Sequence, residues 1–178
     1  GILWELAPAF ASVGLKSQRL DFIARDPGIL GFLHAVGKSS LTCGIEGISE
    51  RLRAFLNKSL DAAAVDASVR QLLAVPVREL KLFYLITGHE TDADIAEFRA
   101  FLGRLAGWRA GPRHATRVVF SFGYLVRMPR TPLRHDRLFL DRGHLEKLGD
   151  KLQRACTQAG GEFRLAAPWS EYLASQIL

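Results

Sequence analysis

The sequence predicts an α/β fold: a partial (β/α) barrel with mainly parallel strands and outer helices. Strand-like and helix-like segments alternate, with roughly one of each per thirty to forty residues. The segment 79–86 is almost continuously apolar after Lys81, which is typical of a parallel strand buried on both faces. A complete eight-unit barrel takes about 250 residues. Because this chain has 178, we expect an open, curved sheet or a segment of a barrel; a small independent α/β sandwich is the alternative.

Three elements are expected before residue 40. Apolar side chains at helical spacing predict a helix over 2–13. A short apolar run predicts a strand over 18–23. A helix over 26–36 follows, with Asp26 as its cap and Pro27 in the first helical position.

The stretch after residue 39 is the centre of the predicted site. A strand over 40–46 breaks on small residues, and a helix over 49–57 follows with Ser49 as its N-cap. Backbone N–H groups and the positive end of the helix dipole gather there, at the carboxyl end of a strand, where parallel sheets bind ligands. We therefore expect Glu46 and Ser49 to face a polar ligand.

The rest of the chain repeats this plan without a linker. We expect a single domain over 1–178, made of an N-terminal helix (1–14), a barrel segment (15–135) and a C-terminal part (136–178). The first residues resemble a helix that begins upstream, so we expect a piece of a longer protein. The further expected elements are a helix over 61–74, the strand over 79–86, a helix from Thr91 to Leu105, a strand over 116–122, a helix over 142–159, a strand over 163–165 and a terminal helix from Ser170.

Charge and cysteine content limit the classes of function. The net charge is +6, from 24 Lys and Arg against 18 Asp and Glu, but the basic residues are scattered, so only charge supports a nucleic-acid-binding domain. Cys43 and Cys156 lack the spacing of a zinc or iron–sulfur site, and we expect both to be buried and reduced. No apolar stretch is long enough to cross a bilayer and no signal peptide is recognised, so we expect a cytoplasmic protein with no membrane partner.

Several motifs, in order along the chain, resemble one enzyme family. GIEGISERLR at 44–53, with FLNK soon after, resembles the fourth-strand segment of radical S-adenosylmethionine (SAM) enzymes, in the branch that often carries a cobalamin-binding domain. LKLFYLITGHETDADI at 80–95 resembles the fifth strand of that branch, and the segment 118–133, ending in PRTPL, resembles the sixth. SQRLD at 17–21 stands where the third strand has a similar motif. The resemblance covers residues 15–135 and corresponds to the later half of the barrel only.

The chain also departs from the family pattern. The cluster-binding CxxxCxxC and the glycine-rich segment that holds the SAM amino group are absent from it. Gly47 replaces the usual Ser or Ala, Ile48 stands where Gly is usual, and His89 replaces a Leu-Pro pair. This chain alone therefore lacks the ligands of the redox centre.

The resemblance implies the SAM- and substrate-binding half of an enzyme that, when intact, cleaves SAM reductively with an iron–sulfur cluster; cobalamin is a further cofactor of this branch. It implies that Glu46 accepts hydrogen bonds from the ribose or the amino group of SAM, that the Gly88 backbone approaches the adenine, and that Tyr124 flanks the ring. Neither catalytic residues nor a substrate are identified, and no metal ligand is assigned. The implied cofactor-binding residues are Arg19, Glu46, Ser49, Gly88, Glu90 and Tyr124.

The implied partner is the missing N-terminal half of the barrel. A barrel cut before its third strand leaves an unpaired edge near residues 18–23, and such edges are usually paired or covered. We therefore expect self-association through this edge, or coverage by the N-terminal helix.

Most of these residues have a structural alternative. In the structural alternative, Glu46 only belongs to the start of a helix and Glu90 caps a helix. Arg19 then forms an ion pair with Asp21. His89 fits an exposed loop. Two other functions also stay open: a non-catalytic α/β ligand-binding module and, on charge alone, a nucleic-acid-binding domain. The arginines of one proline-marked loop fit either an anion site or a solvated surface: Arg127, Arg130, Arg134 and Arg137.

Overall fold

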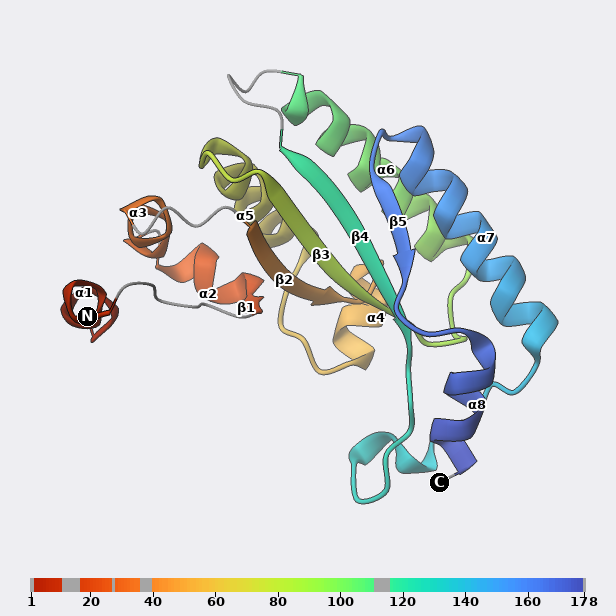
Figure 1. Ribbon diagram of the computed structural model, residues 1–178. Helices are drawn as coiled ribbons and strands as arrows, with labels where there is room; N and C mark the ends of the chain where they lie inside the picture. Colours follow the sequence, from red (N-terminus) through yellow and green to blue (C-terminus); the bar gives the residue numbers. More distant parts are fainter. Residues whose placement is uncertain (1, 11–16, 27, 36–39, 111–115, 178) are drawn as a thin grey trace.

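The computed structural model describes residues 2–10, 17–26, 28–35, 40–110 and 116–177. They form a five-stranded sheet in which all neighbouring strands are parallel and follow the order β1-β2-β3-β4-β5 (Figure 1). The expected α/β fold with sequential parallel strands is confirmed. The strands are β1 (Gln18–Arg19), β2 (Ser40–Glu46), β3 (Glu79–Ile86), β4 (Arg117–Tyr124) and β5 (Glu162–Leu165).

Helices connect the strands, as the alternating sequence pattern predicts. None of the helices in the described part of the chain is long and apolar enough to cross a membrane. The helices are α1 (Ile2–Leu6), α2 (Leu20–Arg25), α3 (Gly28–Ala35), α4 (Glu50–Phe55), α5 (Ala62–Ala74), α6 (Asp92–Arg109), α7 (Arg142–Gln158) and α8 (Trp169–Ile177), with 3₁₀ turns η1 (Ala7–Ala9) and η2 (Pro132–His135).

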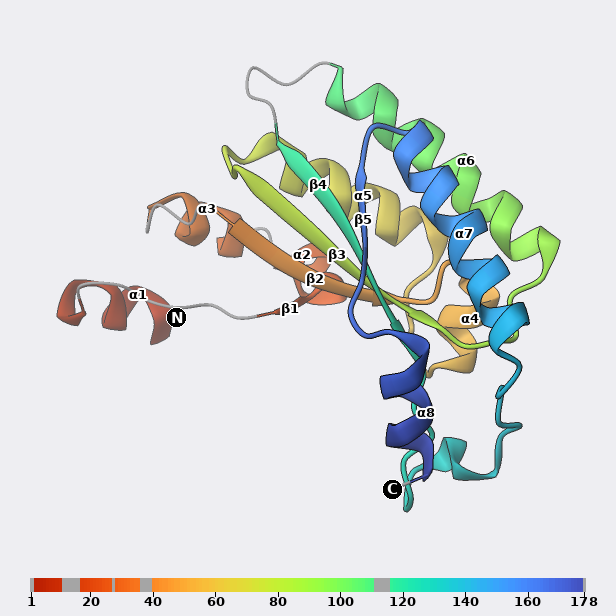
Figure 2. The ribbon, with the colours of Figure 1, turned by 45° about the vertical axis from the view of Figure 1, so that its right-hand side comes forward.

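The two faces of the sheet have different surroundings. Helices α5, α6 and α7 cover one face, whereas no described helix covers the other (Figures 1 and 2). The burial pattern of β3 agrees, since every second residue from Leu80 to Ile86 is buried against the helices and the residues between are partly exposed. The expectation that this strand is buried on both faces is therefore wrong. We call the uncovered side the open face.

An aromatic cluster forms the centre of the core between sheet and helices. Tyr84 of β3 stacks on Phe122 of β4 with ring centroids 5.1 Å apart, and Phe98 of α6 meets Tyr84 edge-on at 5.4 Å. All three residues are at most 1% exposed. Burying each such ring contributes about 1.5–3 kcal/mol, which anchors α6 to the middle of the sheet.

The N-terminal part differs most from expectation. The predicted strand over 18–23 is wrong beyond Arg19, because the chain turns into α2 at Leu20. Leu20 and Ile23 are three residues apart and both fully buried, which suits a helix face, while Phe22 between them is 51% exposed. The helix predicted over 2–13 ends at Leu6 and continues as η1, and its residues 11–13 lie outside the described part.

The other predicted elements are found close to their expected bounds, although α6 continues to Arg109 and β4 to Tyr124. The expected cap of α3 is present, because Asp26 Oδ1 accepts a hydrogen bond from the Gly28 N–H. Pro27 and residue 36 lie outside the described part.

Candidate functional site

The candidate site lies at the carboxyl edge, where the segments following β2, β3 and β4 meet. Figure 1 shows α4, α8 and the segment between β4 and α7 gathered at this end of the sheet. In parallel sheets this edge is the usual place for ligands because loops converge there over a packed floor. Most of the residues singled out from the sequence lie along it.

Glu46 ends β2 in an unusual backbone conformation. Its φ is 72°, in the left-handed region that residues with a side chain seldom adopt, and a bulge separates it from Gly44 in the pairing with β3. The carboxylate folds back over Gly44, where an added Cβ would lie 3.3 Å from Oε1. Oε1 is also 2.7 Å from the ammonium of Lys58. Strained residues of this kind persist only where the surrounding structure holds them, and they cluster at ligand sites.

Arg19 lies beside Glu46 at the same edge. It is aligned with Gly44 across the β1–β2 pair, and its guanidinium donates two hydrogen bonds of 3.0 Å to Asp21, so the expected ion pair is present. Asp21 raises the pKa of Arg19, and the negative charge of Glu46 adds to that rise. The edge therefore carries two carboxylates and two cations from separate elements.

Ser49 is the N-cap of α4, as predicted, but its hydroxyl is buried and bonded within the protein. Its Oγ accepts a hydrogen bond from the Leu52 N–H and donates one of 2.5 Å to Asp94 in α6. Ser49 is 0% exposed. The structure therefore places it between two helix ends, where its burial keeps it out of reach of a ligand in this arrangement.

Asp94 connects the two helix starts at the carboxyl edge. Arg51 donates to it at 2.6 and 3.2 Å, and Thr91 donates through both its N–H and its hydroxyl. Burial by itself raises the pKa of Asp94, but the hydrogen bonds from Arg51, Ser49 and Thr91 outweigh it and hold the pKa well below its usual value. Arg51 also donates to the His89 carbonyl at 2.7 Å, which ties the loop after β3 to α4.

Glu90 holds the loop after β3 and does not cap α6. Its carboxylate accepts hydrogen bonds from the N–H groups of Thr87 and Gly88 and from the Thr87 hydroxyl, at 2.7–2.9 Å. The cap of α6 is Thr91, in a capping box with Asp94. The helix-cap alternative for Glu90 is therefore wrong.

Gly88 makes a close approach to a ring, but the ring belongs to the protein. Its φ is 85°, and an added Cβ would overlap the ring of Phe139. The space above this glycine is thus filled by Phe139 in the present structure, where the resemblance places the adenine.

His89 and Arg127 both hold Asp136 in the segment after β4. His89 Nε2 lies 3.0 Å from both carboxylate oxygens, and Arg127 donates to Oδ2 at 2.7 and 3.2 Å. Burial opposes ionisation of Asp136, but these two partners lower its pKa overall. His89 is consequently part of a network, not a free loop residue, and the network links the loops after β3 and β4.

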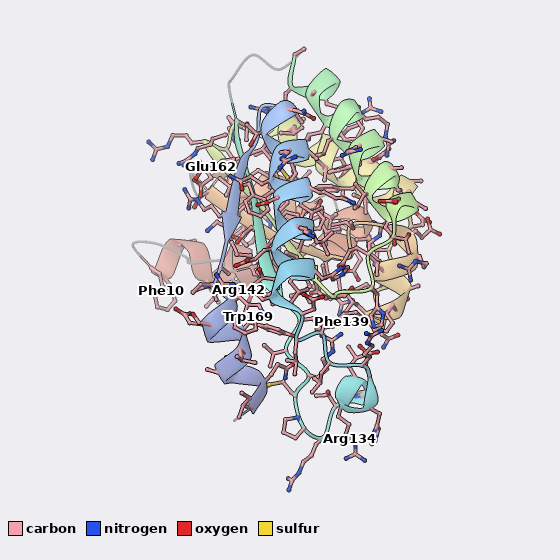
Figure 3. The ribbon with its side chains drawn as sticks, turned by 90° about the vertical axis from the view of Figure 1, so that its right-hand side faces the viewer. Phe10, Arg134, Phe139, Arg142, Glu162 and Trp169 are labelled. Carbon is pink, nitrogen blue, oxygen red and sulfur yellow. The ribbon has the colours of Figure 1, made fainter. Side chains whose placement is uncertain are left out.

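Arg127 is the buried member of the predicted arginine cluster. Its side chain is 2% exposed and also donates to the carbonyls of Leu125 and Thr87, so it joins the ends of β3 and β4. Arg130 and Arg134 are exposed, and Arg134 lies on η2 at the outer end of the segment (Figure 3). Arg137 lies over the Phe139 ring at 5.2 Å. The four arginines therefore do not form one anion site.

Tyr124 lies on the helix-covered face of the sheet. It is 9% exposed and packs on Tyr172 of α8 at 5.1 Å, and burial raises its pKa. Glu46 folds over the open face, so the structure separates these two predicted residues. Arg19 and Glu46 come together, whereas Gly88 and Glu90 share a second cluster with Phe139.

The described residues contain no group of three or more His, Cys, Asp or Glu side chains able to hold a metal ion. Cys43 and Cys156 are both buried as free thiols, as expected, and burial raises the pKa of each to about 12.

Lys58, Asp94 and Phe139 are site residues that the sequence reasoning missed. For Asp94 a local signal existed, because Thr91 and Asp94 have the spacing of a capping box. Phe139 has no such signal, since it meets Gly88 only through the fold.

Comparison of the chain with protein-family models and with curated proteins found no match. What the site does is therefore argued from the sequence motifs and the geometry above.

Proposed function

We propose that this chain is the SAM- and substrate-binding half of a radical SAM enzyme. The observation that carries the proposal is Glu46: a carboxylate held in a left-handed conformation at the carboxyl end of a parallel strand, within the motif GIEGISERLR. A strained carboxylate at this position has no role in the cap of α4, which Ser49 supplies. Its placement fits recognition of hydroxyl or ammonium donors.

The arrangement of the sheet supports a barrel segment. In a doubly wound sheet the strand order reverses at a switch point and helices lie on both faces. Here the order is sequential throughout, and the long connecting helices α5, α6 and α7 lie on one side of the sheet. A barrel opened along its length has this topology, with the open face as its inner wall.

The residues around Glu46 fit an amino-acid-like group. Glu46 is suited to an ammonium or to ribose hydroxyls, and Lys58 and Arg19 are suited to a carboxylate. When bound, SAM supplies the reductive cleavage chemistry together with an iron–sulfur cluster. The described residues offer no ligand set for that cluster, so the proposal assigns its ligands to another part of the protein. Cobalamin remains part of the proposal through the sequence resemblance alone.

The residues around Gly88 must rearrange if the Gly88 backbone is to contact adenine. Phe139 covers it now, and Phe139 belongs to a segment tied down by Arg127 and His89 through Asp136. In the proposed function Phe139 either moves aside or itself packs on the adenine. Substitution of Phe139 distinguishes these two cases. If Phe139 packs on the adenine, its loss weakens SAM binding; if it only covers Gly88 and must move aside, its loss strengthens SAM binding.

SAM binding by the Glu46→Gln variant tests the proposal. Losing a charged hydrogen bond costs about 1.5–3 kcal/mol, so the SAM affinity measured by calorimetry falls about tenfold to a hundredfold. Glu146→Gln is the matched control, because Glu146 is an exposed, ion-paired glutamate on α7. Equal SAM affinity in wild type and both variants would return Glu46 to a structural role. In the full-length protein, a CxxxCxxC preceding this segment separates the enzyme from a non-catalytic SAM-binding module.

A further inference from the structure

Alternate residues of β2, β3 and β4 form the open face. Because paired residues of parallel strands point to the same side, the strand register fixes which side chains are neighbours there. Two rows cross the middle of this face: Thr42–Lys81–Val119 and, nearer the carboxyl edge, Gly44–Phe83–Ser121.

Paired charges lie at the amino ends of β3 and β4 and along the β5 side of the two rows, where Glu162 is aligned with Val119 and Arg164 with Ser121. Glu79 Oε2 lies 3.2 Å from Arg117 Nη1, Arg117 pairs with Glu162, and Glu162 Oε1 lies 2.6 Å from Arg164 Nε. Glu162 lies on β5 beside α7 in Figure 3. These four side chains form a ladder across β3, β4 and β5 in which positive and negative charges alternate and balance.

Lys81 is next to this ladder but takes no part in it. Within the described part of the chain its ammonium has neither an ion pair nor a hydrogen bond, although the side chain is partly buried. Thr42 and Ser121 are likewise partly buried residues, and their hydroxyls have no hydrogen-bond partner among the described residues. One cation and two hydroxyls thus share the middle of the open face without a protein partner among the described residues.

Phe83 supplies an apolar surface between these groups. Its ring leans toward β4, where an added Cβ on Gly123 would lie 3.4 Å from Cζ. On the β2 side, only Glu46 atoms lie within 4 Å of an added Cβ on Gly44. The neighbours of Phe83 on the β2 side are therefore Gly44 and the Glu46 carboxylate that folds over it. Lys81 is two residues away, about 6–7 Å along the strand.

We propose that the middle of the open face binds a small organic anion with a flat apolar or aromatic body. Lys81, assisted by Thr42 and Ser121, holds the carboxylate or phosphate, and Phe83 packs against the body. Binding sites of this type combine an apolar surface with a few converging polar groups. The identification of this anion as the substrate rests on the proposed function. The binding of the anion to the open face does not rest on it.

Titration of the chain with phenyl phosphate, followed by amide chemical shifts, tests the inference. The largest shifts are expected at Gly44, Phe83 and Ser121, and the dissociation constant rises at least about tenfold in Lys81→Met. Lys81→Arg retains binding because it keeps the charge. Lys147→Met is the matched control, since Lys147 is exposed on α7, away from the open face.

Three further probes identify which part of the ligand matters. Inorganic phosphate and benzyl alcohol are both expected to bind more weakly than phenyl phosphate, because each supplies half of the contacts. Benzoate tests the carboxylate against the phosphate. Equal affinity of Lys81→Met and Lys147→Met, shifts centred on Lys58 and Arg19, or inorganic phosphate binding as tightly as phenyl phosphate would each overturn the inference.

The result is separable from the proposed function. Glu46→Gln is expected to lower SAM affinity without lowering phenyl phosphate affinity, because it removes a negative charge near Gly44 and so cannot weaken the binding of an anion. If phenyl phosphate binds as described and SAM does not bind, the anion site stands and the radical SAM proposal fails. If SAM binds and phenyl phosphate does not, only the anion site is lost.

Discussion

The hydroxyl of Ser49 donates a 2.5 Å hydrogen bond to Asp94, and this bond joins the amino ends of α4 and α6. Each helix follows a strand of the sheet, so the bond also fixes the loops after β2 and β3 relative to each other. Arg51 reinforces it from outside by bonding to Asp94 and to the His89 carbonyl. The connection between α4 and α6 therefore depends on one carboxylate, that of Asp94, a residue that is 3% exposed.

Asp94→Asn is expected to lower the free energy of unfolding by about 2 kcal/mol at pH 7, because charged hydrogen bonds are replaced by weaker ones. The folded-state pKa of Asp94 is lowered, below the value of about 3.9 in an unfolded chain. Its stabilisation is therefore complete at neutral pH and is lost as the pH falls below about 4. Urea unfolding at several pH values measures this, and the difference between wild type and variant shrinks in acid. Asp150→Asn, at an exposed position of α7, is the control and changes little.

Gly88→Ala is expected to destabilise the protein by more than about 2 kcal/mol, because a left-handed φ costs about 1–2 kcal/mol and the new methyl group also overlaps Phe139. In a double-mutant cycle, Phe139→Ala removes the overlap and leaves the backbone cost. Gly103→Ala on α6 is the control: with nothing within 4 Å of its added Cβ, it stabilises the helix by about 0.5–1 kcal/mol. Additive effects of the Gly88 and Phe139 substitutions would show that the two residues do not meet in solution.

Local patterns were sufficient to predict the α/β fold and much of the carboxyl edge. The strand over 79–86 and the cap at Ser49 depend on neighbours in sequence, and both were predicted. The burial of that strand on both faces was predicted wrongly, because only one face of β3 is covered by helices. Which face of the sheet a side chain occupies is not determined by its neighbours in sequence. Tyr124 was expected beside a ligand at the carboxyl edge, but its place in the alternation of β4 turns it toward α8, and only the register of the sheet reveals this.

In the N-terminal segment the local sequence pattern itself led to a wrong prediction. Leu20 and Ile23 are compatible with either a short strand or one turn of helix, and packing against α5 decides for the helix. Phe139 and Lys58 could not be predicted as partners of Gly88 and Glu46, because contacts between such separated positions arise from tertiary structure alone.

The flank at β1 is expected to mediate self-association of the isolated chain. β1 is an edge strand of only two residues, and large apolar side chains near this end are exposed: Trp4 at 51%, Phe10 at 60% and Phe22 at 51%. Trp4 packs edge-on against Phe32 at 5.3 Å, which covers only part of this surface. Sedimentation velocity over a range of concentrations should detect dimers or larger species, and Phe10→Ser with Phe22→Ser should reduce them. A protein that stays monomeric at high concentration contradicts the expectation.

Glu46→Gly is expected to stabilise the fold while it abolishes the proposed ligand contact. A left-handed conformation costs a residue with a side chain about 1–2 kcal/mol, and glycine adopts it freely, whereas the partly exposed ion pair with Lys58 contributes at most about 1 kcal/mol. The net gain in unfolding free energy is therefore up to about 1 kcal/mol, measured by urea unfolding. Glu46→Gln serves as the comparison, because it keeps the strain and removes only the charge, so it gains no stability. Asn57→Gly is a second control, since Asn57 also has a positive φ of 55°, but asparagine tolerates that region and the gain is smaller. If Glu46→Gly is less stable than wild type, Glu46 is there for the fold; if it is more stable and binds SAM poorly, the strain at this position serves ligand binding.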